Sequence, residues 1–376
     1  MKIGFEAKRV FNNYTGLGNY CRTLLENIAE LHHDEVESHL FTPRIQDNAR
    51  THHFLDSGDY HLHLPKGAFK TYWRTAGVVK DLQQEGIELF HGLSHELPVG
   101  IRKSGVKSVV TIHDLIFRHY PKQYNRMDNL IYDVKFKYAC ENADKVVAIS
   151  ECTKNDIIDF YGIDPAKIEV IYQTCDDSFR GEVASEQRAK AVYRYGLPTE
   201  FILYVGSIIP RKKLKAIVEA LYTMPESERV PLVAIGAGGP YKDEILSFVQ
   251  EHKLEKWVYF PEKVAFSDFP ALYQQAQAFI YPSIYEGFGI PIIEALFSQT
   301  PVITSNLSCL PEAAGPDACY VDPYQPESVA EGIRKVVQEQ SLRESMIEKG
   351  LAYVQRFDKA IVTAQMVNLY KEVLDS

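Results

Sequence analysis

The chain has 376 residues, a length that predicts two domains, because a single hydrophobic core rarely extends that far. Hydrophobic residues make up 45% of it and charged residues 24%, the composition of a globular protein with a sizeable core. The formal net charge of -9 excludes general nucleic-acid binding, which needs a surplus of cations for phosphate contacts.

Short apolar runs alternate with helical patterns along the first half of the chain. They do not alternate strictly between apolar and polar residues, and many end in glycine, serine, histidine or proline. This is typical of strands that a parallel sheet buries on both faces. We expect strands at residues 3–7, 39–42, 89–93, 108–113 and 146–150, with a helix over residues 19–31.

The second half repeats this alternation. We expect strands at residues 201–206, 232–236, 258–260, 278–282, 302–305 and 319–322, with helices over 214–221 and 327–338. The pattern predicts an α/β fold with a Rossmann-like, doubly wound parallel sheet in each half. Because such sheets bind ligands beyond the carboxyl ends of their strands, the polar and glycine residues that end these runs are the candidate site residues.

A polar stretch without a clear strand, residues 176–198, provides the domain boundary, and we place the linker over 176–187. This predicts an N-terminal domain of residues 1–180 and a C-terminal domain of residues 187–357. A last predicted helix, over 359–374, carries apolar residues at near-helical spacing, which requires an apolar partner surface.

None of the six cysteines forms a C-x-x-C pair, so neither a zinc site nor a redox motif is expected from them. The chain opens as MKIGFEAKRV, directly into a predicted strand, without the apolar stretch of a secretory signal. It also contains no apolar run long enough to span a bilayer. We therefore expect a cytoplasmic protein.

Two glycines, Gly16 and Gly18, precede the first long predicted helix. A Gly-x-Gly alone is weak evidence, and Cys21 stands where a dinucleotide fingerprint has its third glycine. The next strand ends at Thr42 without an acidic residue for the ribose of NAD, which disfavours a dehydrogenase. A phosphate-binding loop and a simple helix-capping turn both remain open.

Histidines stand at two further strand ends. The segment from Thr111 to Leu115, TIHDL, places His113 at a predicted carboxyl edge, where an isolated histidine is more often structural than functional. A second segment, from His91 to Pro98, ends the strand at 89–93, and its polar residues His91, His95 and Glu96 are further candidate site residues.

In the second half, Gly206 ends the first strand, and Arg211 and Lys212 follow before a helix. These cations could neutralise a diphosphate group, and arginine could do so with two parallel hydrogen bonds. A solvated basic turn is the alternative, and the position directly after a strand favours the functional interpretation.

The most specific segment is YPSIYEGFGIPIIE, which runs from Tyr281 to Glu294. A strand ends in it, a loop holds Glu286 and the tripeptide Gly287–Gly289, and a helix starts near Pro291, because proline suits a first helical turn. Glycines allow a ligand to approach the backbone, and free amides at a helix start favour an anion. The two carboxylates could accept hydrogen bonds from sugar hydroxyls.

This segment resembles the Glu-x7-Glu signature of the family 4 retaining glycosyltransferases, whose fold is called GT-B. Residues 206–213 resemble the same family's Gly-x4-Arg-Lys-Asn stretch. The resemblance covers nearly the whole chain and is densest from Phe201 to Gly315. It implies two facing Rossmann-like domains, the first on the acceptor side and the second binding the donor, with residues 358–376 crossing back to the first.

The resemblance also implies the activity: transfer of a hexose from a nucleotide diphosphate sugar to a glycan or lipid-linked acceptor. Within the family, the chain resembles the branch that makes bacterial surface polysaccharides, often from mannose-type donors. It further implies a catalytic set and a donor-binding set. The catalytic set is His113, Arg211, Lys212 and Glu286. The donor-binding set is Gly16, Gly18, Gly206, Gly287, Phe288, Gly289 and Glu294.

Two departures bear on this assignment. Many family members have arginine directly after the first glycine, where this chain has Ser207, and Lys213 stands where asparagine is frequent. No Asp-x-Asp occurs in the sequence, so no metal and no other cofactor is expected, and the cations would stabilise the leaving diphosphate instead. The alternative functions are a non-catalytic sugar-nucleotide-binding protein and an epimerase-like or phosphorylase-like GT-B protein.

A basic and aromatic stretch lies at residues 66–80. It mixes Phe69, Tyr72 and Trp73 with Lys70 and Arg74, a composition that can lie on an anionic bilayer. Peripheral contact with the inner face of the membrane would suit a lipid-linked acceptor. An ordinary packed helix with a solvated basic side is the alternative.

Overall fold

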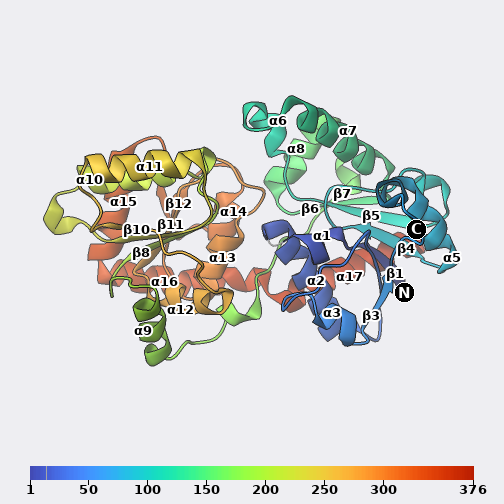
Figure 1. Ribbon diagram of the computed structural model, residues 1–376, viewed down its shortest axis with the longest axis horizontal. Helices are drawn as coiled ribbons and strands as arrows, with labels where there is room; N and C mark the ends of the chain where they lie inside the picture. The colour runs from blue at the N-terminus through green and yellow to red at the C-terminus, as the bar shows by residue number, and fades with distance from the viewer. Residues whose placement is uncertain (14) are drawn as a thin grey trace. The chain divides into compact units, whose positions relative to one another are not determined.

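The structure is a computed structural model that describes residues 1–13 and 15–376, and these residues form two compact α/β units (Figure 1). The first unit comprises Met1–Thr174 and Phe357–Ser376, and the second comprises Cys175–Arg356. Each unit contains one parallel sheet with helices on both faces, so the predicted doubly wound, Rossmann-like architecture is confirmed.

The sheet of the first unit has seven strands in the order β3-β2-β1-β4-β5-β6-β7. They are β1 (Lys2–Glu6), β2 (Glu37–Phe41), β3 (Tyr60–His63), β4 (Leu89–Gly92), β5 (Lys107–Ile112), β6 (Lys145–Ala148) and β7 (Ile168–Val170). The strand β3 was not expected, because its sequence Tyr-His-Leu-His is half polar. It lies at the edge of the sheet, where a strand needs few apolar residues.

Two apolar clusters cover the faces of this sheet. One is built on α2 (Gly16–His32) and α17 (Lys359–Asp375), and the other on α5 (Val78–Gln84), α7 (Arg126–Asn142) and α8 (Glu151–Tyr161). The remaining helices are short: α1 (Lys8–Asn12), α3 (His53–Asp56), α4 (Lys70–Tyr72), the π-helix η1 (Trp73–Gly77) and α6 (Ile116–His119), with 3-10 turns η2 (Ile101–Lys103), η3 (Pro121–Gln123) and η4 (Pro165–Lys167).

The last helix, α17, is part of the first unit, although the whole second unit precedes it in the chain. The Tyr370 hydroxyl lies 2.7 Å from Nδ1 of His91 on β4, and the Tyr370 ring stands edge-on to Phe5 of β1. Lys359 is paired with Glu30 of α2. The apolar face predicted for this helix therefore completes the core of the first unit.

The sheet of the second unit has six strands in the order β10-β9-β8-β11-β12-β13. They are β8 (Ile202–Val205), β9 (Leu232–Ile235), β10 (Val258–Tyr259), β11 (Ala278–Tyr281), β12 (Val302–Ser305) and β13 (Cys319–Val321). The helices are α9 (Ser185–Arg194), α10 (Leu214–Thr223), α11 (Pro240–Glu251), α12 (Phe269–Gln275), α13 (Ile290–Phe297), α14 (Leu310–Ala314), α15 (Pro326–Gln338) and α16 (Gln340–Val354). Its 3-10 turns are η5 (Asp177–Phe179), η6 (Pro210–Lys212), η7 (Glu226–Glu228) and η8 (Phe266–Asp268), and a further turn, η9 (Gln355–Phe357), leads from the second unit back to the first.

The boundary between the units lies between Thr174 and Cys175, ahead of the linker expected over 176–187. The buried ring of Phe179 packs edge-on against Tyr273 of α12, and the amide of Val183 donates to the Gln274 side chain. One buried aromatic ring thus joins this polar segment to the second unit. Across the described parts of the chain, no helix combines the length and apolarity needed to cross a membrane.

Candidate active site

The candidate site of the second unit lies at the carboxyl edge of β8, β11 and β12. Because β8 and β11 are neighbours in the sheet, the loops that follow them lie side by side. Gly206, directly after β8, has a φ of +152°, which favours glycine. A Cβ on Gly236, at the end of β9, would lie 1.8 Å from the carbonyl oxygen of Gly206, so the chain also needs glycine there.

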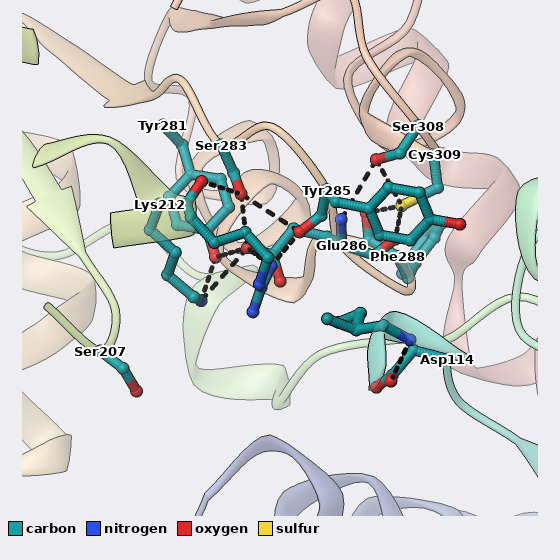
Figure 2. Close-up of polar contacts among 12 residues, drawn as sticks. Asp114, Ser207, Lys212, Tyr281, Ser283, Tyr285, Glu286, Phe288, Ser308 and Cys309 are labelled. Atoms are coloured by element: carbon teal, nitrogen blue, oxygen red, sulfur yellow. Dashed lines mark hydrogen bonds and ion pairs between the residues drawn. The ribbon is translucent and has the colours of Figure 1, made fainter. Parts of the chain in front are cut away.

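Four side chains converge on one carboxylate oxygen, Oε1 of Glu286 (Figure 2). Nη1 of Arg211 lies 2.8 Å from it, and Nζ of Lys212 lies 3.5 Å from it. The hydroxyls of Ser283 and Tyr281 donate to it at 2.8 and 3.1 Å. None of these four contacts is to the other oxygen, Oε2.

The charges of this cluster control each other's protonation. Burial alone would raise the pKa of Glu286, but the Lys212 ammonium and the Arg211 guanidinium hold that pKa below its ordinary value. Burial lowers the pKa of Lys212, and the Glu286 carboxylate opposes that effect. Glu286 is therefore ionised at neutral pH, and the cluster combines two cationic side chains with one carboxylate.

The loop from Glu286 to Gly289 is supported by the segment that follows β12. The Glu286 amide donates to the Ser308 hydroxyl at 3.1 Å, and the Cys309 thiol lies 3.0 Å from the Glu286 carbonyl and 2.9 Å from that of Phe288 (Figure 2). Gly289, with a φ of +135°, is the N-cap of α13. The side chain of Phe288 is buried, so only its backbone is available to a ligand.

Glu294, the second carboxylate of the predicted signature, stands apart from this cluster on α13. One of its oxygens, Oε2, accepts a hydrogen bond from the Tyr273 hydroxyl at 2.8 Å. Burial raises the pKa of Glu294 to about 7, the Tyr273 hydrogen bond partly offsets that rise, and Asp176 adds to it. Glu294 therefore changes its charge close to neutral pH.

In the first unit, His113 follows β5 and is buried. Its Nε2 lies 2.8 Å from the Leu93 carbonyl, and its Nδ1 lies 3.1 Å from the side-chain nitrogen Nε2 of Gln173. These partners identify the tautomer with the proton on Nε2 of His113. Burial lowers the pKa of His113 to about 4, so the ring is neutral. A sugar contact through this ring would have to replace one of these two hydrogen bonds. The neighbouring Asp114 orients the loop by accepting from the Ile116 amide (Figure 2).

The two histidines of the segment that begins at His91 have buried side chains. His91 is fully buried between Tyr370 and Thr111, and each of its ring nitrogens has a partner. His95 is buried and stacked on Phe136, with ring centroids 4.2 Å apart. Their burial argues against a binding role for these two histidines, whereas Glu96 of the same segment lines a cavity.

Gly16 and Gly18 lie in the first turn of α2. The Asn13 side chain accepts hydrogen bonds from the amides of Gly18 and Thr15, and a Cβ on Gly18 would lie 1.9 Å from the Asn13 carbonyl oxygen. Gly18 is therefore required by the turn itself. A Cβ on Gly16 would meet nothing within 4 Å, which leaves room there for a ligand.

A second set of polar residues lies in the first unit, and of these the sequence had indicated only Glu96 as a candidate site residue. Glu6 ends β1, and burial raises its pKa, while the nearby Arg74 guanidinium lowers it. Arg74 in turn contacts Glu96, which also pairs with Lys135. This set borders a cavity of about 170 Å³ whose other lining residues include Phe41, Trp73, Val78, Phe90, Leu97, Pro98 and Tyr138. The cavity is mainly apolar, and its lining also includes the charged residues Glu6, Arg74, Glu96 and Lys135.

Further residues of the second-unit site were also missed: Tyr281, Ser283 and Tyr273. The first two stand at a predicted strand end, where their hydroxyls could have been flagged as site candidates. Nothing local to Tyr273 indicates its role, because its partner Glu294 lies on another helix.

Two family models match the chain. The model described as Glycosyltransferase Family 4 matches residues 14–179, and the model described as Glycosyl transferases group 1 matches residues 186–352. The chain is also 27% identical over 396 aligned residues to the O-antigen chain mannosyltransferase B of Escherichia coli. That alignment covers 99% of this chain and 100% of that protein.

Solved structures resemble the chain over nearly its full length. A glycosyltransferase from Rickettsia africae gives a TM-score of 0.78 at 19% identity, with coverage of 99% of this chain and 98% of that one. Anabaena HepE in complex with UDP and glucose gives a TM-score of 0.74 at 17% identity, with coverage of 98% and 99%. These likenesses extend across both units.

Proposed function

Because the chain belongs to the GT-B glycosyltransferases of the family 4 kind, we propose that it transfers a hexose from a nucleoside diphosphate donor during the assembly of a surface polysaccharide. The two family models and the solved structures confirm the family and the fold expected from the sequence. Mannose is the first candidate for the hexose, since the similar Escherichia coli protein is an O-antigen chain mannosyltransferase. The acceptor is a glycan or a lipid-linked glycan.

The observation that carries this proposal is the convergence of Arg211 and Lys212 on Glu286 at the carboxyl edge of the sheet. A diphosphate that binds here meets two preorganised cations, which stabilise the charge that develops as the sugar–phosphate bond breaks. Oε2 of Glu286 accepts a hydrogen bond from a hydroxyl of the donor sugar, because Oε1 already contacts four side chains. The amides of Gly287–Gly289 face the sugar and diphosphate, and Glu294 accepts the ribose hydroxyls.

We further propose that the transfer retains the anomeric configuration and needs no metal. The bond between the anomeric carbon and the phosphate oxygen breaks while the acceptor oxygen bonds to the same face of that carbon. The acceptor's proton passes to the leaving phosphate oxygen, so no protein nucleophile takes part. The two cations replace a divalent ion as the electrostatic partner of the diphosphate.

The first unit is assigned to the acceptor in this proposal. Its cavity beside Glu6, Arg74 and Glu96 combines apolar walls with charged groups, which suits a molecule with an apolar part and hydroxyls. Phe69 and Tyr72 shortly precede Arg74 in the chain and are exposed. Both side chains could enter the surface of an anionic bilayer. We accordingly place the protein in the cytoplasm, in contact with the inner face of the membrane.

The test combines binding and turnover. UDP-, GDP- and ADP-sugars are compared by thermal shift, because the correct donor stabilises the folded chain by mass action. The preferred donor is then incubated with a glycan acceptor in excess EDTA, and the anomeric configuration of the product is determined by NMR. Turnover with retained configuration supports the proposal. Inverted product, or activity that is lost in EDTA and restored by a divalent ion, contradicts the mechanism, and binding without turnover favours the non-catalytic alternative.

A further inference from the structure

Four residues of β2 and β3 in the first unit place their side chains on one face of the sheet edge. Glu37 and His39 are two residues apart on β2, and His61 and His63 are two residues apart on β3, so each pair shares a face. The parallel register sets His39 directly opposite His61. The rings of His39 and His61 stack with centroids 4.6 Å apart.

The ligand-type atoms of three of these residues stand at the spacing of a metal coordination sphere. Oε1 of Glu37 lies 3.0 Å from Nε2 of His39 and 3.5 Å from Nε2 of His61, and one ligand atom from each of the three residues lies within 4.8 Å of the other two. Zinc bonds of about 2.0–2.1 Å to nitrogen and oxygen in tetrahedral geometry separate neighbouring ligand atoms by roughly 3.3 Å. The three atoms therefore need only small adjustments to hold one ion.

The second ring nitrogen of His39 also has a hydrogen-bond partner. Its Nδ1 lies 2.9 Å from Nε2 of His63, and Nδ1 of His63 lies 3.9 Å from a carboxylate oxygen of Glu85, directly after α5. Metal-bound histidines commonly donate their other N–H to an acceptor, which fixes the tautomer and the ring plane, and an unprotonated Nε2 of His63 can act as that acceptor here. His39 is buried and His63 is stacked flat on Phe41, so neither ring turns freely.

From this geometry we infer that Glu37, His39 and His61 form a binding site for a divalent ion of the zinc class. Two imidazoles and a carboxylate are a donor set that zinc accepts. The side chains of Glu37 and His61 are 43% and 56% exposed, so the ion can enter from solvent and a water can complete the coordination. Lys2, whose Nζ lies 3.6 Å from Oε1 of Glu37, balances this carboxylate when no ion is bound.

An ion at this site would stabilise the first unit and would take no part in sugar transfer. Glu37 is the first residue of β2 and His61 the second of β3, so the ion would lie at the amino end of these strands. Ligands of doubly wound sheets bind at the opposite, carboxyl end. An ion here would link the edge strand β3 to its neighbour β2. A metal at this site is therefore compatible with a sugar transfer that uses no metal.

The experiment measures zinc binding by the full-length chain, independently of any sugar transfer. The purified protein is stripped with EDTA and exchanged into metal-free buffer, and zinc is titrated in competition with a chromophoric chelator. The variants are His61→Ala and Glu37→Gln, both at exposed positions, and the matched control is His33→Ala, an exposed histidine of the same unit outside the cluster. Circular dichroism checks that each variant is folded.

We expect one zinc per chain and a rise in the melting temperature on zinc addition in both the unaltered chain and His33→Ala. Affinity should fall at least tenfold in His61→Ala and Glu37→Gln, and cobalt should give the visible spectrum of a tetrahedral site only where the ligands are intact. Equal zinc affinity in His61→Ala and His33→Ala would overturn the inference, as would an unaltered chain that binds no zinc at micromolar concentration. Neither result depends on catalysis, so the proposed function is tested separately.

Discussion

The guanidinium of Arg211 stands 2.8 Å from Oε1 of Glu286 and also donates to the Tyr285 carbonyl. The two residues lie far apart in the chain, on the loops after β8 and β11, and the adjacency of these strands brings them together. Arg211 thus has two functions: it carries charge, and it holds the loop that presents Glu286. The Lys212 ammonium contacts the Tyr281 hydroxyl and the Glu286 carboxylate, so Lys212 is the better position for testing the effect of charge.

Replacement of Lys212 by alanine should lower kcat by roughly two orders of magnitude, the scale for loss of one preorganised charge contact. The neighbouring Lys213 provides the control. Its φ of +56° is tolerated by asparagine, so Lys213→Asn should keep both fold and turnover. Steady-state kinetics and melting temperatures of both variants check this. Near-normal kcat in a folded Lys212→Ala would remove Lys212 from the mechanism.

Replacement of Glu286 by glutamine should destabilise the ligand-free chain by about 3 kcal/mol, because Arg211 and Lys212 then lose their buried counter-charge. A nucleoside diphosphate should restore stability more strongly in this variant than in the parent, since its phosphates supply the missing negative charge. Tyr281→Phe, which removes the hydroxyl contacts to Glu286 and Lys212 but keeps the counter-charge, should cost less, about 2 kcal/mol. Denaturant unfolding with and without the nucleotide measures all three proteins, and an unchanged nucleotide effect in Glu286→Gln would argue against a diphosphate at this cluster.

The pKa of Glu294, raised by burial from 4.5 to about 7, predicts how donor binding depends on pH. In the free protein, the raised pKa favours the protonated folded state. That contribution to stability is fully present below pH 4.5 and is lost as the pH rises through about 7. If ribose hydroxyls donate to the carboxylate, the bound state favours the ionised form, so affinity should increase as the pH rises towards 7 and then level off.

Calorimetry in two buffers of different ionisation enthalpy tests this expectation. Near pH 7 the parent should release protons on binding its donor, whereas Glu294→Gln should release fewer and show a flatter pH profile. Glutamine keeps an acceptor for the Tyr273 hydroxyl, so the helix should remain in place. Proton release that is the same in both proteins would assign the linkage to another group.

Membrane contact should depend on Phe69 and Tyr72, whose exposed fractions are 82% and 69%. We expect the chain to pellet with anionic liposomes, and the double variant Phe69→Ser, Tyr72→Ser to remain in the supernatant. Arg74 is unsuitable for this test, because its guanidinium is tied to Glu96 inside the unit. Tyr193→Ser, at an 89% exposed aromatic of the second unit, is the control. Equal behaviour of the parent and the double variant would contradict the assignment.

The sequence by itself determined the strands that end at the candidate site, the glycine-rich loops after them and the pair of cations at Arg211 and Lys212. These features depend on local patterns, because strand periodicity, backbone freedom at glycine and the start of a helix are encoded within a few neighbouring residues. The family resemblance rested on the same short segments.

Tertiary structure alone decided which of these groups meet. The sheet order brings Arg211 beside Glu286, the return of α17 takes His91 into the core, and one buried ring, Phe179, joins the expected linker to the second unit. The register of β2 with β3 aligns His39 with His61, although half-polar β3 was not expected as a strand. Each of these contacts joins residues distant in the chain. Their geometry is set by how strands pair and pack, which no local pattern specifies.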